Sequence, residues 1–183
     1  MSFATFSLRA VGALSAGLLA LGTLAACTPE PEPKPTKTPL FASDEEAFKA
    51  AEETYRAYTD ALNNVDTSDP ETFDAVIAWT TGDASAALKK SLSELHAESV
   101  TLVGSTTIQQ ATPLSFDTDA GEISMHVCAD VSKTDVLNST GASLVPDGRA
   151  PIQSILVVFS TSDSPTALRV SSTTGDESHT CSP

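Results

Sequence analysis

The sequence predicts an α+β domain in which three N-terminal helices precede about four antiparallel strands. Between residues 43 and 98, apolar residues recur at steps of three and four, which is the spacing of amphipathic helices. After Ser99, β-branched residues and period-two alternation replace that spacing. Because a run of helices followed by a run of strands is typical of an α+β layout, we expect the sheet to bury its apolar face against the helices.

The first helix is expected to begin at Ser43, where Ser43 and Glu46 form a capping box, and to end near Asn63 or Asn64. Its apolar stripe consists of Phe48, Ala51, Tyr55, Tyr58 and Leu62. Charged residues occupy the other side of this helix, so one face is predicted to be buried.

Two shorter helices follow. Asp69-Pro70-Glu71 starts the second one, because Asp can cap a helix and Pro is tolerated in the first turn. Trp79 lies near its end. The third helix has an apolar stripe at Ala84, Leu88, Leu92 and Leu95.

Strands are expected at residues 100–110, 123–131, 152–159 and 167–172, followed by an irregular tail over residues 175–183. In the second of these strands, side chains alternate between two faces. His126, Cys128 and Asp130 therefore share the face opposite Met125 and Val127. They either face solvent or line a cavity that the core does not fill.

An export signal is predicted at the N-terminus. Arg9 is followed by an apolar run from Ala10 to Leu21, the layout of a secretory signal. Leu24-Ala25-Ala26-Cys27 then resembles the lipobox of bacterial lipoproteins, in which the Cys receives a diacylglyceryl group and the chain is cut before it. The alternative is an ordinary Cys beside a non-lipoprotein cleavage site.

This interpretation divides the chain into a signal peptide (1–26), a lipidated Cys27 with a Pro-rich tether (27–42) and a folded domain (43–183). The prolines favour an extended spacer, although a proline-motif ligand for a partner is an alternative. We expect the protein on the extracytoplasmic face of the cell membrane, held by two or three acyl chains on Cys27.

Charge narrows the choice of partners. The chain carries 24 acidic and 10 basic residues, a formal net charge of −14. Nucleic acid is not expected as a partner, because its binding depends on Lys and Arg that displace counterions. A clamp on anionic lipid headgroups is disfavoured for the same reason.

If Cys27 is lipidated, the two other cysteines remain, and oxidising conditions outside the cytoplasm favour a Cys128–Cys181 disulfide. A metal site is not expected, because no C-x-x-C motif occurs and His96, His126 and His179 are scattered. No cofactor is expected, since the phosphate-cradling glycine motifs are missing from the sequence.

The order of parts carries a resemblance. The lipobox, the Pro-rich spacer, the helix DEEAFKAAEETYRAYTDALNNV, the Asp-Pro-Glu restart, GSTTIQQ, HVCADVSKTDVLN and a Cys near the C-terminus follow one another. Together they resemble small actinobacterial lipoproteins with a nuclear transport factor 2-like domain (NTF2-like, the cone shared with SnoaL and cystatin-like proteins). The resemblance implies helices lying in a strongly curved antiparallel sheet, and in such proteins a Cys pair is often present. It implies no activity, because one fold hosts many functions.

Four residues are catalytic candidates, namely Tyr55, Tyr58, His126 and Asp130. An enzyme of this shape would place acid and base groups on the inner wall, but a Tyr on a helical stripe is more often core. Our leading expectation is a non-catalytic binding domain for an envelope protein or an apolar ligand, with a Ser- and Thr-rich sheet face as docking surface and a core filled by Phe48, Tyr55, Trp79 and Phe159. The rival is an isomerase or cyclase acting on a hydrophobic small molecule.

Overall fold

A computed structural model describes residues 39–181, which include the predicted domain up to its second cysteine. The expected signal peptide, Cys27 and nearly all of the Pro-rich tether lie outside the described residues. Among the residues described, no helix is long and apolar enough to cross a membrane.

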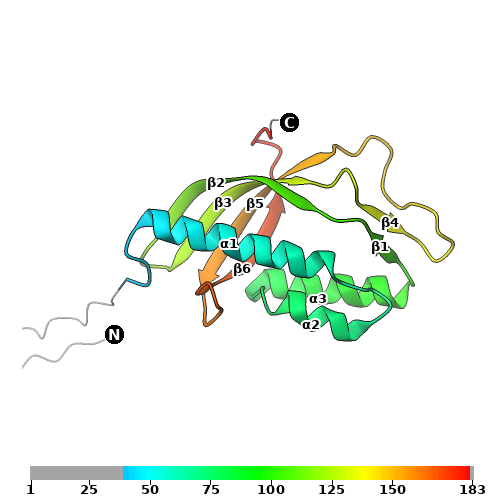
Figure 1. Ribbon diagram of the computed structural model, residues 1–183, viewed down its shortest axis with the longest axis horizontal. Helices are drawn as coiled ribbons and strands as arrows, with labels where there is room; N and C mark the ends of the chain where they lie inside the picture. The colour runs from blue at the N-terminus through cyan, green and yellow to red at the C-terminus, as the bar shows by residue number, and fades with distance from the viewer. Residues whose placement is uncertain (1–38, 182–183) are drawn as a thin grey trace, which may run out of the picture. The chain divides into compact units, whose positions relative to one another are not determined.

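The longest helix, α1 (Asp44–Asn63), begins and ends where the sequence predicts. Ser43 caps it by accepting a hydrogen bond from the Glu46 N–H at 3.2 Å. The Glu46 carboxylate accepts from the Ala42 N–H at 2.8 Å, one residue before the expected partner. Ala47, Ala51 and Tyr55 are buried on one face, which lies against the sheet (Figure 1).

The three-residue 3-10 helix η1 (Pro70–Thr72), α2 (Phe73–Ile77) and α3 (Gly82–Ala97) form a second packing unit. Val65, Phe73, Val76 and Leu92 make its buried cluster. Trp79 does not fill the core as expected, because it is only half-buried and belongs to neither core cluster. Its carbonyl instead accepts from the Val170 N–H at 3.0 Å and joins the helices to the sheet.

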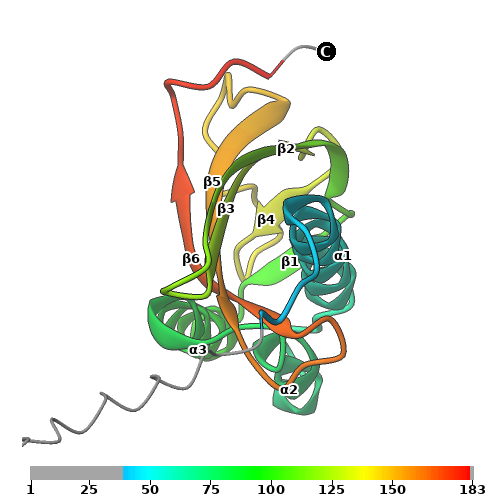
Figure 2. The same cartoon turned by 90° about the vertical axis from the view of Figure 1, so that its left-hand side faces the viewer.

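Four antiparallel strands form the main sheet in the order β2-β3-β5-β6. They are β2 (Thr107–Asp117), β3 (Glu122–Asp130), β5 (Ile152–Thr161) and β6 (Leu168–Gly175). Register irregularities occur twice in the pairing of β2 with β3 and once between β5 and β6, and such bulges bend a strand. The sheet curves around α1 (Figure 2), which confirms the predicted α+β class with three helices and a curved sheet.

A small two-stranded sheet was not predicted from the sequence. β1 (Thr101–Val103) pairs with β4 (Asp135–Leu137), whereas one strand was expected over 100–110 and none at 135–137. Gly104 separates β1 from β2 at a φ of +81°, and a Cβ there would lie 1.8 Å from the Lys133 carbonyl oxygen. Only glycine fits this close backbone approach, so the predicted strand is broken there.

The two faces of the main sheet are covered differently. On the inner face, Ile123, Met125 and Val127 of β3 are buried in the core with α1. On the outer face, the tail after β6 is attached by a Cys128–Cys181 disulfide and by a 2.9 Å hydrogen bond from the Asp176 N–H to the Ser154 carbonyl. The tail therefore removes the centre of this face as the docking surface that the sequence suggested.

Candidate ligand cavity

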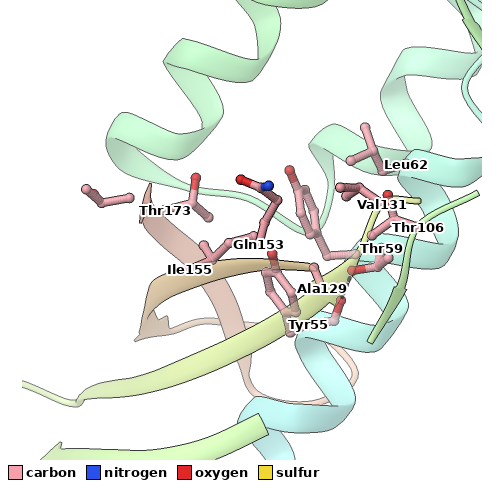
Figure 3. Close-up of a pocket in the computed structure, with 11 residues that line it drawn as sticks. Tyr55, Thr59, Leu62, Thr106, Ala129, Val131, Gln153, Ile155 and Thr173 are labelled. Atoms are coloured by element: carbon pink, nitrogen blue, oxygen red, sulfur yellow. Dashed lines mark hydrogen bonds between the residues drawn. The ribbon is translucent and has the colours of Figure 1, made fainter. Parts of the chain in front are cut away.

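A cavity of about 250 Å³ lies between α1 and the inner face of the sheet (Figure 3). Its wall is formed by the C-terminal part of the apolar stripe of α1, by the ends of β3, β5 and β6, and by the loop before β2. The lining residues are Tyr55, Tyr58, Thr59, Leu62, Thr106, Ala129, Val131, Gln153, Ile155, Thr173 and Thr174. Thr173 and Thr174 are exposed, so the cavity opens to solvent at the end of β6.

Two tyrosines form the helical side of the cavity. Tyr55 and Tyr58 are three residues apart on α1, which places them on one face, and their ring centroids are 5.6 Å apart. Burial raises the pKa of both phenols above the ordinary value of 10.0, and for Tyr55 the neighbouring Tyr58 raises the pKa further. Both phenols therefore remain protonated hydroxyls at neutral pH.

The sheet supplies a small side chain and an amide. Ala129 of β3 and Gln153 of β5 are register partners, so both side chains project from the same face. Ala129 leaves room that a larger residue would fill. The Gln153 side-chain amide donates to the Ala150 carbonyl at 2.7 Å, which holds one end of that side chain at the rim.

The lining is uncharged. Of the described residues that form the wall, none is an Asp, Glu, His, Lys or Arg. Hydroxyls, one amide and aliphatic or aromatic carbon make up the surface. Such a wall can hold a neutral molecule by apolar contact and a few hydrogen bonds, but it offers no group that exchanges a proton readily near pH 7.

The four catalytic candidates are not brought together. Tyr55 and Tyr58 lie in the cavity, whereas His126 lies on the outer face with its Nδ1 atom 2.9 Å from Asp176 Oδ2. Asp130 ends β3, where its carboxylate accepts from the Ser132 N–H at 2.9 Å; hydrogen bonding to Ser132 lowers the Asp130 pKa. The idea that all four share an inner wall is therefore wrong.

A second hollow of about 320 Å³ adjoins the first and shares Tyr58 and Thr173 with it. The first turns of α3 and the end of β6 complete its wall, with Asp83, Ala84, Ala87, Leu88, Ser91 and Ser172. Among the described residues that line the two hollows, the charged one is Asp83. Asp83 lies at the beginning of α3 and does not line the first cavity, which contains both tyrosines.

Gln153 is the lining residue that sequence reasoning missed most clearly. In β5, residues 153, 155, 157 and 159 share the inner face, and the other three are Ile, Val and Phe. A single polar residue in the inner register of the most apolar strand is a signal for a cavity, and it could have been found from alternation alone.

The fold has counterparts among solved structures. A protein from Novosphingobium aromaticivorans, provisionally named an aromatic ring hydroxylase, superposes with a TM-score of 0.52 at 13% identity, over 73% of this chain and 90% of that one. Aln2 from a Streptomyces species gives a TM-score of 0.44 at 14% identity, over 73% and 91%. No protein-family model and no curated protein sequence matches the chain.

The first of these structures shares the α+β arrangement of three helices and a curved antiparallel sheet, the NTF2-like fold that the sequence resembles. At this level of identity the likeness shows the fold alone. The fold by itself assigns no activity to the chain.

Proposed function

We propose that this chain is an actinobacterial lipoprotein, anchored on the outer side of the cytoplasmic membrane, whose NTF2-like domain binds a small, uncharged, largely apolar ligand. The observation that carries the proposal is the cavity wall, which combines two neutral tyrosines with aliphatic carbon and has no charged residue among those described. Binding of a charged ligand there would strip its water without offering a compensating charge.

The polar groups of the cavity fit a ligand with one or two hydrogen-bonding atoms. The hydroxyls of Tyr55 and Tyr58 make no hydrogen bond to the described part of the chain, and neither is a fully enclosed polar atom. Both are therefore free to meet a ligand. The cavity is slightly smaller than the ~300–1,000 Å³ of typical ligand pockets, which favours a compact molecule.

Catalysis is the weaker candidate. General acid–base chemistry works best when the pKa of the acting group is near the operating pH. Burial moves the tyrosine pKa values away from neutrality, and the groups that could supply a second titratable side chain, His126 and Asp130, lie elsewhere. An isomerase or cyclase would need a reactive substrate whose own groups provide the missing acid or base.

The anchor is proposed from Leu24-Ala25-Ala26-Cys27 and the apolar segment before it. Two acyl chains hold a protein on a bilayer far more firmly than one, since each buried CH₂ contributes about 0.8 kcal/mol. A Cys27→Ser variant should move from the membrane fraction to the soluble fraction of cells or their medium. An equal amount of wild type and variant in membranes would contradict the anchor.

Native mass spectrometry tests the ligand. The full chain, purified from actinobacterial membranes in detergent, should carry a reproducible extra mass that is lost on denaturation. Thr173→Trp should remove that mass by blocking the mouth, whereas Thr118→Trp, the same change in an exposed turn, should retain it. A native mass equal to the denatured mass in the wild type, or an adduct that Thr173→Trp leaves in place, would overturn the proposal.

A further inference from the structure

A His-x-Cys motif occurs twice on the outer side of the sheet, once in a strand and once in the tail that covers it. His126-Val127-Cys128 lies on β3, and His179-Thr180-Cys181 lies in the tail. In a strand, residues two apart project from the same face, so His126 and Cys128 point together toward the tail. The second pair lies on the first, histidine against histidine and cysteine against cysteine. The two histidine rings stack with centroids 4.3 Å apart, and the two cysteines form the disulfide.

Three donor atoms of this layer, two of them the bonded sulfurs, lie close together. A ring nitrogen of His179 and the sulfurs of Cys128 and Cys181 all lie within 4.8 Å of one another. Cys128 is buried, while His179 and Cys181 are half-buried at the edge of the tail. A cation could therefore reach the cluster from the tail side.

His126 is the candidate for the fourth donor. It is not one of the three residues whose donor atoms lie within 4.8 Å of one another, and its ring stacks on that of His179, so the ring has to turn for its nitrogen to reach the ion. The His126 Nδ1 atom faces Asp176 Oδ2 at 2.9 Å, which leaves Nε2 as the nitrogen for another partner. In metal sites, a carboxylate that accepts a hydrogen bond from one imidazole nitrogen orients the other nitrogen toward the ion. Asp176 lies at that position, although its contact with Nδ1 does not have hydrogen-bond geometry.

Polar atoms without partners concentrate in the same layer. Among residues 39–181, the buried side-chain N and O atoms that make no hydrogen bond are His126 Nδ1 and Ser154 Oγ. The His126–Asp176 contact has ion-pair distance, but the ring N–H does not point at the carboxylate. Ser154 is the register partner of Cys128. Buried polar atoms are normally satisfied, so this layer is incomplete in its oxidised form.

We propose that reduction of the Cys128–Cys181 disulfide converts this layer into a Cys₂His₂ site for a zinc-class divalent cation. A dithiol reductant gives two electrons and two protons to the disulfide and becomes a disulfide itself. When Zn²⁺ binds, the two cysteine thiols release their protons, and two thiolates and two neutral imidazoles surround the ion. Thiolate and imidazole are the donors of closed tetrahedral zinc sites.

The disulfide and the metal exclude each other, because the sulfurs cannot ligate Zn²⁺ while they are bonded to one another. Each holds the tail on β3, the disulfide by a covalent bond and the metal by shared ligands. The layer is thus a redox-dependent metal site on the face opposite the ligand cavity, and it does not depend on the proposed ligand.

Cobalt titration tests the site. The full chain in detergent is reduced with a phosphine, and Co²⁺ is added as a spectroscopic substitute for Zn²⁺. We expect one Co²⁺ per chain, with thiolate-to-cobalt charge-transfer absorption and the intense visible bands of tetrahedral cobalt, both removed by Zn²⁺. The unreduced chain should show neither. A reduced chain without tetrahedral cobalt absorption, whether folded or unfolded, would overturn the proposal.

Matched variants separate the site from chance binding to two thiols. His126→Gln and His179→Gln should each weaken Co²⁺ binding by more than the roughly 10- to 100-fold that loss of an outer-shell partner causes. His96→Gln on α3 and Cys27→Ser should leave the affinity unchanged. Equal affinity of wild type, His126→Gln and His179→Gln would show a two-thiolate adventitious complex and would also overturn the proposal.

Discussion

The two faces of the main sheet use polar side chains in opposite ways. The inner face holds an uncharged cavity, with Tyr55 and Gln153 among its polar groups. The outer face holds the His126–Asp176 ion pair and the Cys128–Cys181 disulfide, with His126 and Cys128 under the tail. Because β3 contributes alternate residues to both faces, one strand separates an uncharged cavity wall from a layer that holds an ion pair and a disulfide.

The largest expected difference between the faces is in packing. Phe159 is fully buried on the inner face of β5, with its ring centroid 6.5 Å from that of Tyr55. Phe159→Ala should lower the free energy of unfolding by about 3–5 kcal/mol in urea titrations, because it leaves a cavity. Leu156→Ala, on the outer face opposite His126, should cost clearly less. Equal losses would mean that the tail packs as tightly as α1.

The disulfide should contribute the next largest effect. It closes a loop between residues 53 positions apart, which corresponds to about 4 kcal/mol in the chain-entropy model. Cys181→Ser should therefore lower unfolding stability by ~2–4 kcal/mol while leaving any bound mass in the cavity. Loss of that mass in a folded Cys181→Ser protein would show that the two faces are coupled.

Alkaline pH should destabilise the inner face. The folded pKa of Tyr55 is raised by burial, so above its ordinary value of 10.0 the unfolded chain loses a proton that the folded chain keeps. The free energy of unfolding then falls by up to about 1.4 kcal/mol for each pH unit above 10.0. Tyr55→Phe should unfold at a higher pH than wild type in a circular-dichroism titration. Identical alkaline midpoints would contradict burial of this phenol.

Acid pH should produce the smallest effect, on the outer layer. Hydrogen bonding to Ser178 lowers the folded pKa of Asp176 below its ordinary value of 3.8. Its contribution to stability is present above pH 3.8 and is lost as pH falls through the folded pKa. The stability difference between wild type and Asp176→Asn should shrink over that range. A difference that is constant with pH would show that this carboxylate does not act through its charge.

The sequence predicts elements that depend on local signals well, but it predicts contacts between segments far apart in the chain poorly. The bounds of α1 follow from Ser43 and from one apolar stripe, both of which are local signals. β4 gives almost no local signal, because three residues are ordered only by pairing with β1. Gly104 is likewise explained by Lys133, which is distant in the sequence, and not by its neighbours.

The site shows the same division. Alternation along β3 places His126 on the other face of the sheet from Met125. Alternation along β5 likewise identifies Gln153 as a polar residue on the inner face. Alternation cannot show that the tail returns to cover His126, because the irregular tail has no hydrophobic periodicity. The repeated His-x-Cys pairs are visible in the sequence, but only the fold places one pair on the other.

The measurement that tests the proposed ligand cavity most directly is a crystal structure of the full chain, purified from native membranes without reductant. We predict ligand density between Tyr55, Tyr58 and Gln153, with hydrogen bonds to the phenol hydroxyls, and an intact Cys128–Cys181 disulfide under the tail. A cavity closed by its own side chains, or a charged ligand held against the two tyrosines, would contradict this prediction.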